Sequence, residues 1–171
     1  GVVASGTPAD PAAGNTTPLP SQTVDYQGMF KTDLELRYDA ANTRIEEVDN
    51  ILHLIPTGFN ATEETFTLKR STAGIIELNR EDCRDYFKES AWIVNAILDK
   101  AEIVPVGNAR ACKLSLTERS VEEEFDYKIS VYLIPDTNKG LTWELDLTLL
   151  SISSPELVKM MEDTVASFKL R

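Results

Sequence analysis

The densest group of side chains able to hold a cation is the acidic run Glu122-Glu123-Glu124-Phe125-Asp126. Calcium loops also need spaced carbonyl ligands and a glycine that shapes the turn, and this run contains no glycine. Asp136-Thr137-Asn138 begins like a calcium loop, but Leu147 stands where the bidentate glutamate belongs. Runs of like charge are usually hydrated, so we interpret the acidic run as a solvated hairpin end. The sequence predicts no metal site and no cofactor.

The remaining groups with catalytic potential are isolated from one another. His53 is the single histidine, and its place between two leucines favours a strand residue on the less apolar face over a catalytic base. The acid pairs Glu46-Glu47 and Glu144/Asp146 cannot take acid and base roles without a pocket. The sequence has no nucleophile-elbow serine and no glycine-rich phosphate loop. We therefore predict no catalytic residue and no enzymatic activity.

Two cysteines, Cys83 and Cys112, fit no zinc-binding spacing, and one histidine leaves too few soft ligands for a zinc site. Both cysteines fall on faces that we predict to be buried. Two interpretations stay open: a disulfide in an oxidising compartment, or two small buried apolar side chains. Neither cysteine is predicted to be a nucleophile, because no motif ties a base to it.

The charge balance limits the classes of partner. The 171 residues include 28 Asp and Glu against 17 Lys and Arg, which gives a net charge of −11. Such a chain repels nucleic acid and anionic lipid headgroups, so we expect neither as a partner. The charge is explained by solubility or by a preference for cationic partners. No apolar run reaches the roughly twenty residues of a membrane span, so we predict no transmembrane segment.

Residues 1–28 differ in composition from the rest of the chain. They hold four of the eight prolines and four of the eight glycines, and no lysine or arginine. We predict a disordered Pro/Gly/Ala-rich linker here, since such a segment buries too little surface to offset its ordering entropy. A cytosolic tail would also fit. We favour the stalk of a bacterial lipoprotein with its lipid anchor upstream of residue 1, and therefore an extracytoplasmic, membrane-anchored location.

Residues 29–171 are predicted to form a single α+β domain. Strict alternation from Phe30 to Tyr38 predicts a half-buried strand. The apolar segment from Ile45 to Ile55 and the run from Thr65 to Lys69 predict two more strands. In residues 79–100, apolar side chains recur at steps of three and four, which predicts an amphipathic helix of about twenty residues.

The second half of the domain is predicted to be strands followed by a closing helix. Cys112 to Leu116, Phe125 to Leu133 and Leu141 to Leu149 alternate, and a hairpin turn at Asp136–Gly140 joins the last two runs. Residues 154–168 then carry every sign of a helix. Ser154 is the expected N-cap, and Pro155 takes the first helical position. The apolar stripe consists of Leu157, Met161, Val165 and Phe168. We expect this stripe to cover the apolar side of the sheet, together with the first helix.

The order β-β-β-α-β-β-β-α with this closing helix resembles the Mog/PsbP-like fold family. That family includes the photosystem II extrinsic PsbP proteins and DcrB-type exported lipoproteins. The residues that carry the resemblance are Gly107 to Ala111, the hairpin Tyr132 to Leu145 and Ala166 to Leu170. The resemblance implies an antiparallel sheet packed with helices as an α/β/α sandwich. Charged residues on the second face of several strands indicate that here this face is only partly covered.

The acidic charge, the linker and the lack of motifs favour a non-catalytic extracytoplasmic binding or assembly module. Its expected partner is a protein or cell-surface component, and the resemblance carries over no site residue. The alternative is a carrier that holds a small apolar ligand in a cavity between the sheet and the C-terminal helix. An enzyme is the third hypothesis, because a catalytic site can be built on any fold.

Overall fold

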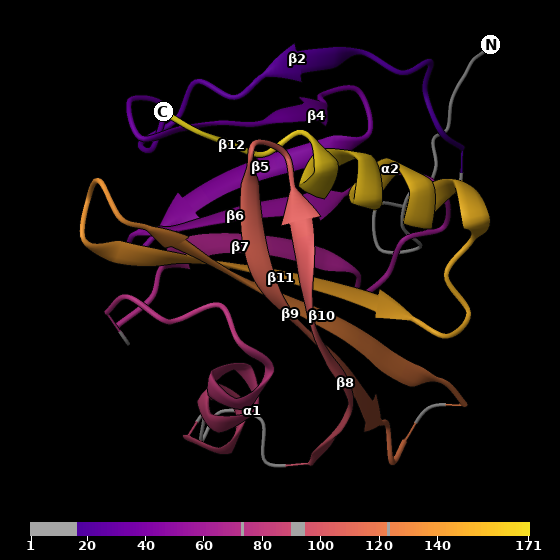
Figure 1. Ribbon diagram of the computed structural model, residues 1–171. Coiled ribbons are helices and arrows are strands. Elements are labelled where there is room, and N and C mark those ends of the chain that lie inside the picture. The colour runs from indigo at the N-terminus through magenta and orange to yellow at the C-terminus, as the bar shows by residue number, and fades with distance from the viewer. Residues whose placement is uncertain (1–16, 73, 90–94, 123) are drawn as a thin grey trace, which may run out of the picture.

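A seven-stranded antiparallel sheet forms the centre of the protein, with strand order β5-β6-β7-β11-β10-β9-β8 (Figure 1). The computed structural model describes residues 17–72, 74–89, 95–122 and 124–171. The strands of this sheet are β5 (Thr43–Val48), β6 (Ile51–Pro56), β7 (Thr65–Arg70), β8 (Ala96–Val106), β9 (Ala109–Arg119), β10 (Asp126–Asp136) and β11 (Leu141–Leu150). The helices are α1 (Arg80–Glu89) and α2 (Pro155–Ala166). These elements give the α+β class predicted from the sequence.

Two short ribbons stand apart from the main sheet. β2 (Thr23–Asp25) pairs with β4 (Arg37–Asp39), and β3 (Leu34–Glu35) pairs with β12 (Lys169–Leu170). Figure 1 shows the β2–β4 ribbon on the far side of α2 from the sheet, and the C-terminal residues beside the N-terminal elements. Helix α2 therefore lies between the sheet and this ribbon.

The two helices cover opposite faces of the sheet. On β10, Tyr132 and Ile134 belong to the core packed against α2, whereas Val131 and Leu133 belong to a second core that includes Cys83 of α1. Alternate residues of a strand point to opposite faces, so the sheet lies between α1 and α2. The sandwich implied by the resemblance is confirmed, and the expectation of both helices on one side is wrong. Both faces of β10 near Tyr132 carry buried apolar side chains, which is why each face requires a cover there.

Helix α2 forms where the sequence predicted it. The Ser154 hydroxyl accepts a hydrogen bond of 3.2 Å from the Leu157 N–H, and Pro155 occupies the first turn. The four stripe residues of the prediction are buried, namely Leu157, Met161, Val165 and Phe168. They pack against the face of the sheet that carries Trp143.

The helix predicted over residues 79–100 is half wrong. The described part of α1 ends at Glu89, and the last residues of the predicted helix lie in strand β8, which pairs along its length with β9. Ile97 and Leu98 fit a helical period and a strand equally well over so short a run, and pairing with β9 decides between them. Residues 90–94, on which part of the predicted helix relied, lie outside the described residues.

Two of the three predicted N-terminal strands also need correction. Residues 29–33 form a turn, with the Leu34 N–H donating to the Phe30 carbonyl at 3.1 Å, and only β3 and β4 follow. The single segment predicted from Ile45 to Ile55 is a hairpin of two strands. Asp49 and Asn50 turn the chain with φ of 53° and 62°, values that these two residue types tolerate well. The third strand is confirmed as β7.

Residues 17–28, predicted to belong to the disordered linker, are ordered against the domain. The side chain of Asn42 accepts a bond of 2.8 Å from the Leu19 N–H, and Tyr26 is buried. Side-chain partners thus replace the sheet hydrogen bonds that Pro-rich sequence cannot make. Residues 1–16 of the predicted linker lie outside the described residues. No helix in the described part of the chain is both long enough and apolar enough to cross a bilayer.

Candidate functional site

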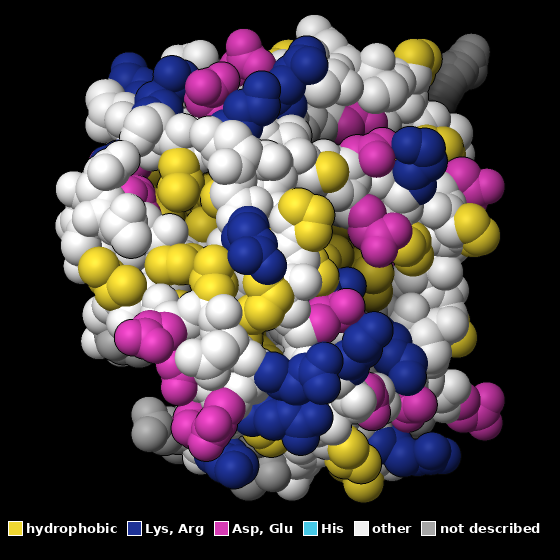
Figure 2. All heavy atoms as spheres, viewed as in Figure 1, with side chains coloured by type: hydrophobic (Ala, Val, Ile, Leu, Met, Phe, Trp, Pro, Cys, Tyr) yellow, Lys and Arg dark blue, Asp and Glu magenta, His cyan; other side chains and the backbone are white. Residues whose placement is uncertain are grey.

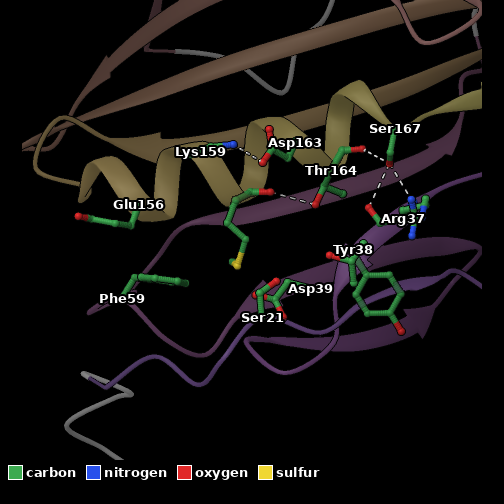
Figure 3. Close-up of a pocket in the computed structure, with 12 residues that line it drawn as sticks. Ser21, Arg37, Tyr38, Asp39, Phe59, Glu156, Lys159, Asp163, Thr164 and Ser167 are labelled. Carbon is green, nitrogen blue, oxygen red and sulfur yellow. Dashed lines mark hydrogen bonds and ion pairs between the residues drawn. The ribbon is translucent and has the colours of Figure 1, made fainter.

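A groove of about 440 Å³ runs between α2 and the β2–β4 ribbon (Figure 3). Pockets that bind small molecules or side chains of partners are commonly about 300–1,000 Å³. α2 lines one wall, and the segment around β2, β4 and Phe59 lines the other. The lining residues are Ser21, Thr23, Arg37, Tyr38, Asp39, Phe59, Glu156, Lys159, Met160, Asp163, Thr164 and Ser167.

The two walls are joined at one end of the groove by Ser167. Its hydroxyl accepts a hydrogen bond of 2.8 Å from the Arg37 N–H and lies 3.0 Å from the Arg37 carbonyl oxygen. The single proton of this hydroxyl is shared between the Arg37 carbonyl and the Thr164 carbonyl, which lies 2.7 Å away, so the α2 C-cap residue is bonded both to its own helix and to β4. This contact fixes the spacing between helix and ribbon before any ligand binds.

The floor of the groove contains a buried carboxylate that is fully engaged. Asp39 accepts hydrogen bonds from the Gln22 N–H (3.0 Å), the Ala41 N–H (3.1 Å) and the Asn42 side chain (2.8 Å). Burial alone would raise the pKa of Asp39, but these donors outweigh burial and hold the pKa below its usual value. Asp39 is therefore a charged anchor for the ribbon and has little capacity left for a ligand.

The opposite end of the groove combines an aromatic ring with a carboxylate. Figure 3 shows Phe59 and Glu156 on opposite walls at this end of the groove, far from Arg37 and Ser167. Phe59 has φ of 59°, a left-handed conformation that is rare for a bulky residue. Such strain is usually held in place by its surroundings and is frequent at ligand clamps. Within the described part of the chain, Glu156 makes no ion pair.

The other charges of the groove already have counter-ions. Arg37 pairs with Asp25 at 3.2 Å, and Lys159 pairs with Asp163 at 2.7 Å. Glu156 is thus the one groove carboxylate in the described chain that neither an ion pair nor a set of hydrogen bonds neutralises.

A second polar cluster is buried under α1, on the other face of the sheet. Glu144 of β11 is 2% exposed, and its Oε1 accepts a hydrogen bond of 2.5 Å from the Tyr86 hydroxyl. Lys69 of β7 lies 3.6 Å from Oε2 of Glu144. Asp146 lies two residues along the same face. Among the described residues, Oε2 of Glu144 and Oδ1 of Asp146 have no hydrogen-bond partner.

The two carboxylates of this cluster cannot both ionise readily. Burial is the largest cause that raises the pKa of Asp146, and the neighbouring Glu144 raises it further, to about 9. Burial and the bond to Glu144 likewise raise the pKa of the Tyr86 phenol. Asp146 is therefore protonated at neutral pH. The bond from Tyr86 to Glu144 links α1 to the sheet.

Comparison with solved structures identifies the architecture. No protein-family model and no curated protein matches the chain. The solution structure of cyanobacterial PsbP (CyanoP) from Synechocystis sp. PCC 6803 superposes with a TM-score of 0.55 and 19% identity, over 89% of this chain and 94% of that one. The chain has a PsbP-like fold.

A crystal structure of a protein from Bacteroides thetaiotaomicron shows the same likeness. Its TM-score is 0.55 at 14% identity, and the match covers 90% of this chain. The chain spans about half of the Bacteroides structure, 49% of its length. At these identities the two structures establish the PsbP-like fold alone.

Two of the three segments that carried the resemblance to PsbP-like proteins, the Gly107 turn and the C-terminal residues, meet in space. The side chain of Asn108 donates to the Leu170 carbonyl at 3.0 Å and accepts from the Leu170 N–H at 2.9 Å. Gly107, with φ of 57°, packs against the carbonyl oxygen of Phe168. Only glycine both adopts this conformation without strain and leaves room for that oxygen. The turn and the C-terminal motif are thus parts of one contact.

The candidate residues named from the sequence lie apart from the groove. Cys83 and Cys112 meet under α1, with their sulfur atoms at bonding distance and their Cα atoms 5.8 Å apart. Asp136 is buried in the β10–β11 turn, where it accepts a bond of 3.1 Å from the Trp143 indole. The turn predicted at this place is confirmed. His53 is half-buried opposite Thr67 on the face that α1 partly covers.

The acidic run lies between β9 and β10. Glu122 and Glu124 are exposed there, Asp126 begins β10, and Glu123 lies outside the described residues. No group of three metal-ligating side chains occurs among the residues that the structure describes.

The space between α2 and the sheet does not support the carrier hypothesis. The void between them lined by Leu54, Phe66 and Met161 measures about 10 Å³. An apolar ligand needs a volume at least an order of magnitude larger. As far as the described residues show, this interface is a packed core.

The surface charge is uneven despite the net charge of −11. Figure 2 shows lysine and arginine side chains gathered over the lower part of the face that carries α2, around β8 to β10. The strand register places Lys100, Lys113 and Lys128 on this face. Lys100 pairs with Glu102 at 3.3 Å, and the Lys113 ammonium lies 5.5 Å from the centre of the Tyr132 ring. Local partners therefore offset part of this positive charge.

Sequence reasoning missed both the groove and the burial of Glu144. The groove depends on the ribbon formed by residues 17–39, half of which was assigned to the linker. From the sequence, Glu144 is expected to be a strand residue that faces solvent. The position of α1 in the structure is what buries it. The nearest sequence signal was its alternation with Trp143 and Leu145, which fixes the face but not what covers it.

Proposed function

We propose that the protein is a non-catalytic, extracytoplasmic module that binds a partner protein or cell-surface component through the groove along α2. The observation that supports this most strongly is the groove itself, about 440 Å³ in volume and held open by Ser167 and Asp39. A preformed site of this kind loses little entropy on binding. The PsbP-like fold is consistent with a module of this class.

The proposed location is extracytoplasmic, on the membrane of a bacterium, with residues 1–16 as the tether to a lipid anchor upstream of residue 1. Cys83 and Cys112 have their sulfur atoms at bonding distance, and we propose that they form a disulfide. Because disulfides persist in oxidising compartments, such a bond supports a location outside the cytoplasm. Fractionation of cells that express the full-length gene product tests the location. Protein in the membrane fraction that added protease can reach is the expected result, and a purely cytosolic pool contradicts the proposal.

Binding through the groove is tested with two tryptophan variants of the full-length protein. Ser21→Trp fills the groove, whereas Ile97→Trp places the same bulk on an exposed β8 residue away from it. After reversible crosslinking in cells, the wild type and Ile97→Trp should retain the same partner, and Ser21→Trp should lose it. Retention by Ser21→Trp contradicts binding through the groove.

A further inference from the structure

The end of the groove that holds Phe59 and Glu156 has the chemistry of a site for a cationic side chain. Phe59, which packs in part against the core, contributes an aromatic ring to the lining, and Glu156 contributes a carboxylate without an ion pair among the described residues. A ring and a carboxylate on opposite walls are complementary to the cation and the apolar stem of lysine or arginine. Met160, beside them in the lining, extends the apolar wall.

The rest of the groove is compatible with a polypeptide. It continues along α2 to Arg37 and Ser167, so an extended segment can lie between helix and ribbon (Figure 3). Because Arg37 pairs with Asp25 and Lys159 with Asp163, the remaining charged groups of the lining are the carboxylates Asp39 and Glu156, and the groove is negative. The net charge of −11 adds a long-range attraction for basic partners.

We propose that the groove takes a basic segment of a partner polypeptide, with one lysine or arginine side chain placed between Phe59 and Glu156. This rests on the proposed function and names the class of ligand. Phe59 contributes through the strained turn that presents its ring, and Glu156 through a charge at the rim of the groove. Both contributions are weak individually, so the affinity depends on several contacts along the groove.

The test uses the full chain labelled with ¹⁵N and a blocked peptide, acetyl-Gly-Arg-Ala-Arg-Gly-amide, as the probe. Amide shifts should move around Phe59 and in α2, and added salt should weaken binding. Glu156→Gln and Phe59→Leu should each weaken it by about threefold, the effect of one exposed cation–π or ionic contact. Glu162→Gln is the matched control, an exposed α2 carboxylate that does not line the groove, and should leave the affinity unchanged.

Two further probes separate the failure of this inference from failure of the proposed function. If acetyl-Gly-Glu-Ala-Glu-Gly-amide moves the groove amides and the basic peptide does not, the ligand class is wrong and the groove remains the site. If spermidine alone binds, the occupant is a free polyamine and the peptide proposal is overturned. If no probe moves groove amides, or if Glu162→Gln weakens binding as much as Glu156→Gln, the inference is contradicted.

Discussion

Asn108 and Leu170, 62 residues apart in the chain, are joined by two hydrogen bonds of 2.9 and 3.0 Å between the Asn108 side chain and the Leu170 backbone. This pair ties the β8–β9 turn to the segment that follows α2. The same segment pairs as β12 with β3, so it also holds the N-terminal elements in place. The position of α2, and with it one wall of the groove, depends on this contact.

The glycine beside Asn108 gives a sharp test of this contact. Gly107 and Gly140 both have positive φ, of 57° and 69°, but only a Cβ at Gly107 would overlap the Phe168 carbonyl oxygen. We expect Gly140→Ala to cost about 1 kcal/mol, the penalty of the backbone conformation alone. Gly107→Ala should cost at least about 2 kcal/mol more, because the C-terminal segment must move. Urea unfolding of both variants measures the difference, and equal losses contradict the contact.

The tyrosine that links α1 to the sheet predicts a second pair of stabilities. Tyr86→Phe removes the donor to the buried Glu144, so we expect a loss of about 1–3 kcal/mol in the free energy of unfolding. Tyr127→Phe removes a hydrogen bond of 2.9 Å to Glu63 in an exposed setting and should cost well under about 1 kcal/mol. If the two variants unfold at the same denaturant concentration, the buried cluster does not hold α1 as described.

The raised pKa of Asp146 predicts that stability falls as the pH rises. The folded state binds this proton more tightly than the unfolded chain, whose carboxyl has a pKa near 3.8. The stabilisation that the Asp146 proton gives to the folded state is therefore complete below about pH 4. Above this pH it decreases by up to about 1.4 kcal/mol per pH unit, until the pH passes the folded-state pKa of about 9. Chemical unfolding at pH 5, 7 and 9 should show this slope in the wild type.

Asp146→Asn is the control for that slope. The amide keeps the shape of the side chain and does not titrate, so the dependence on pH in this window should become much flatter. A wild-type slope that persists unchanged in Asp146→Asn assigns the effect to another group and contradicts the picture of the cluster.

The proposed disulfide predicts that stability depends on redox conditions. Closing the 29-residue separation between Cys83 and Cys112 should stabilise the oxidised protein by about 2–4 kcal/mol. Reductant should lower the unfolding midpoint of the wild type and leave a Cys83→Ala/Cys112→Ala double variant unaffected. Mass spectrometry after alkylation reports the bond directly, and two modified thiols in protein purified under oxidising conditions would falsify it.

The parts of the fold predicted from the sequence are those set by local rules. Helix α2 carries its own cap at Ser154 and its own apolar stripe, and the β10–β11 hairpin carries a turn at Asp136–Gly140. The arrangement of the sheet between two helix layers was predicted from the family resemblance. The helix and the hairpin turn are determined by their own residues and need no contact with a distant part of the chain.

The parts that were missed depend on distant partners. Ile97 and Leu98 are in a strand because β9 pairs with them, and Tyr26 is ordered because it is buried and its hydroxyl donates to Glu47 at 2.6 Å. The candidate site belongs to this second group. The aromatic end of the groove requires a left-handed backbone conformation at Phe59. No local sequence pattern predicts a positive φ for a phenylalanine.

The most direct test of the account is a photo-crosslinking residue placed inside the groove. In cells that express the full-length protein, a benzoylphenylalanine at Met160 reports what touches the groove, and one at Val121, which is fully exposed on the β9–β10 connection, is the control. We predict that position 160 crosslinks to one discrete partner, within a segment of that partner rich in lysine and arginine. Position 121 should not crosslink to this partner. The same adduct from both positions, or no adduct from position 160, would contradict the groove as the binding site.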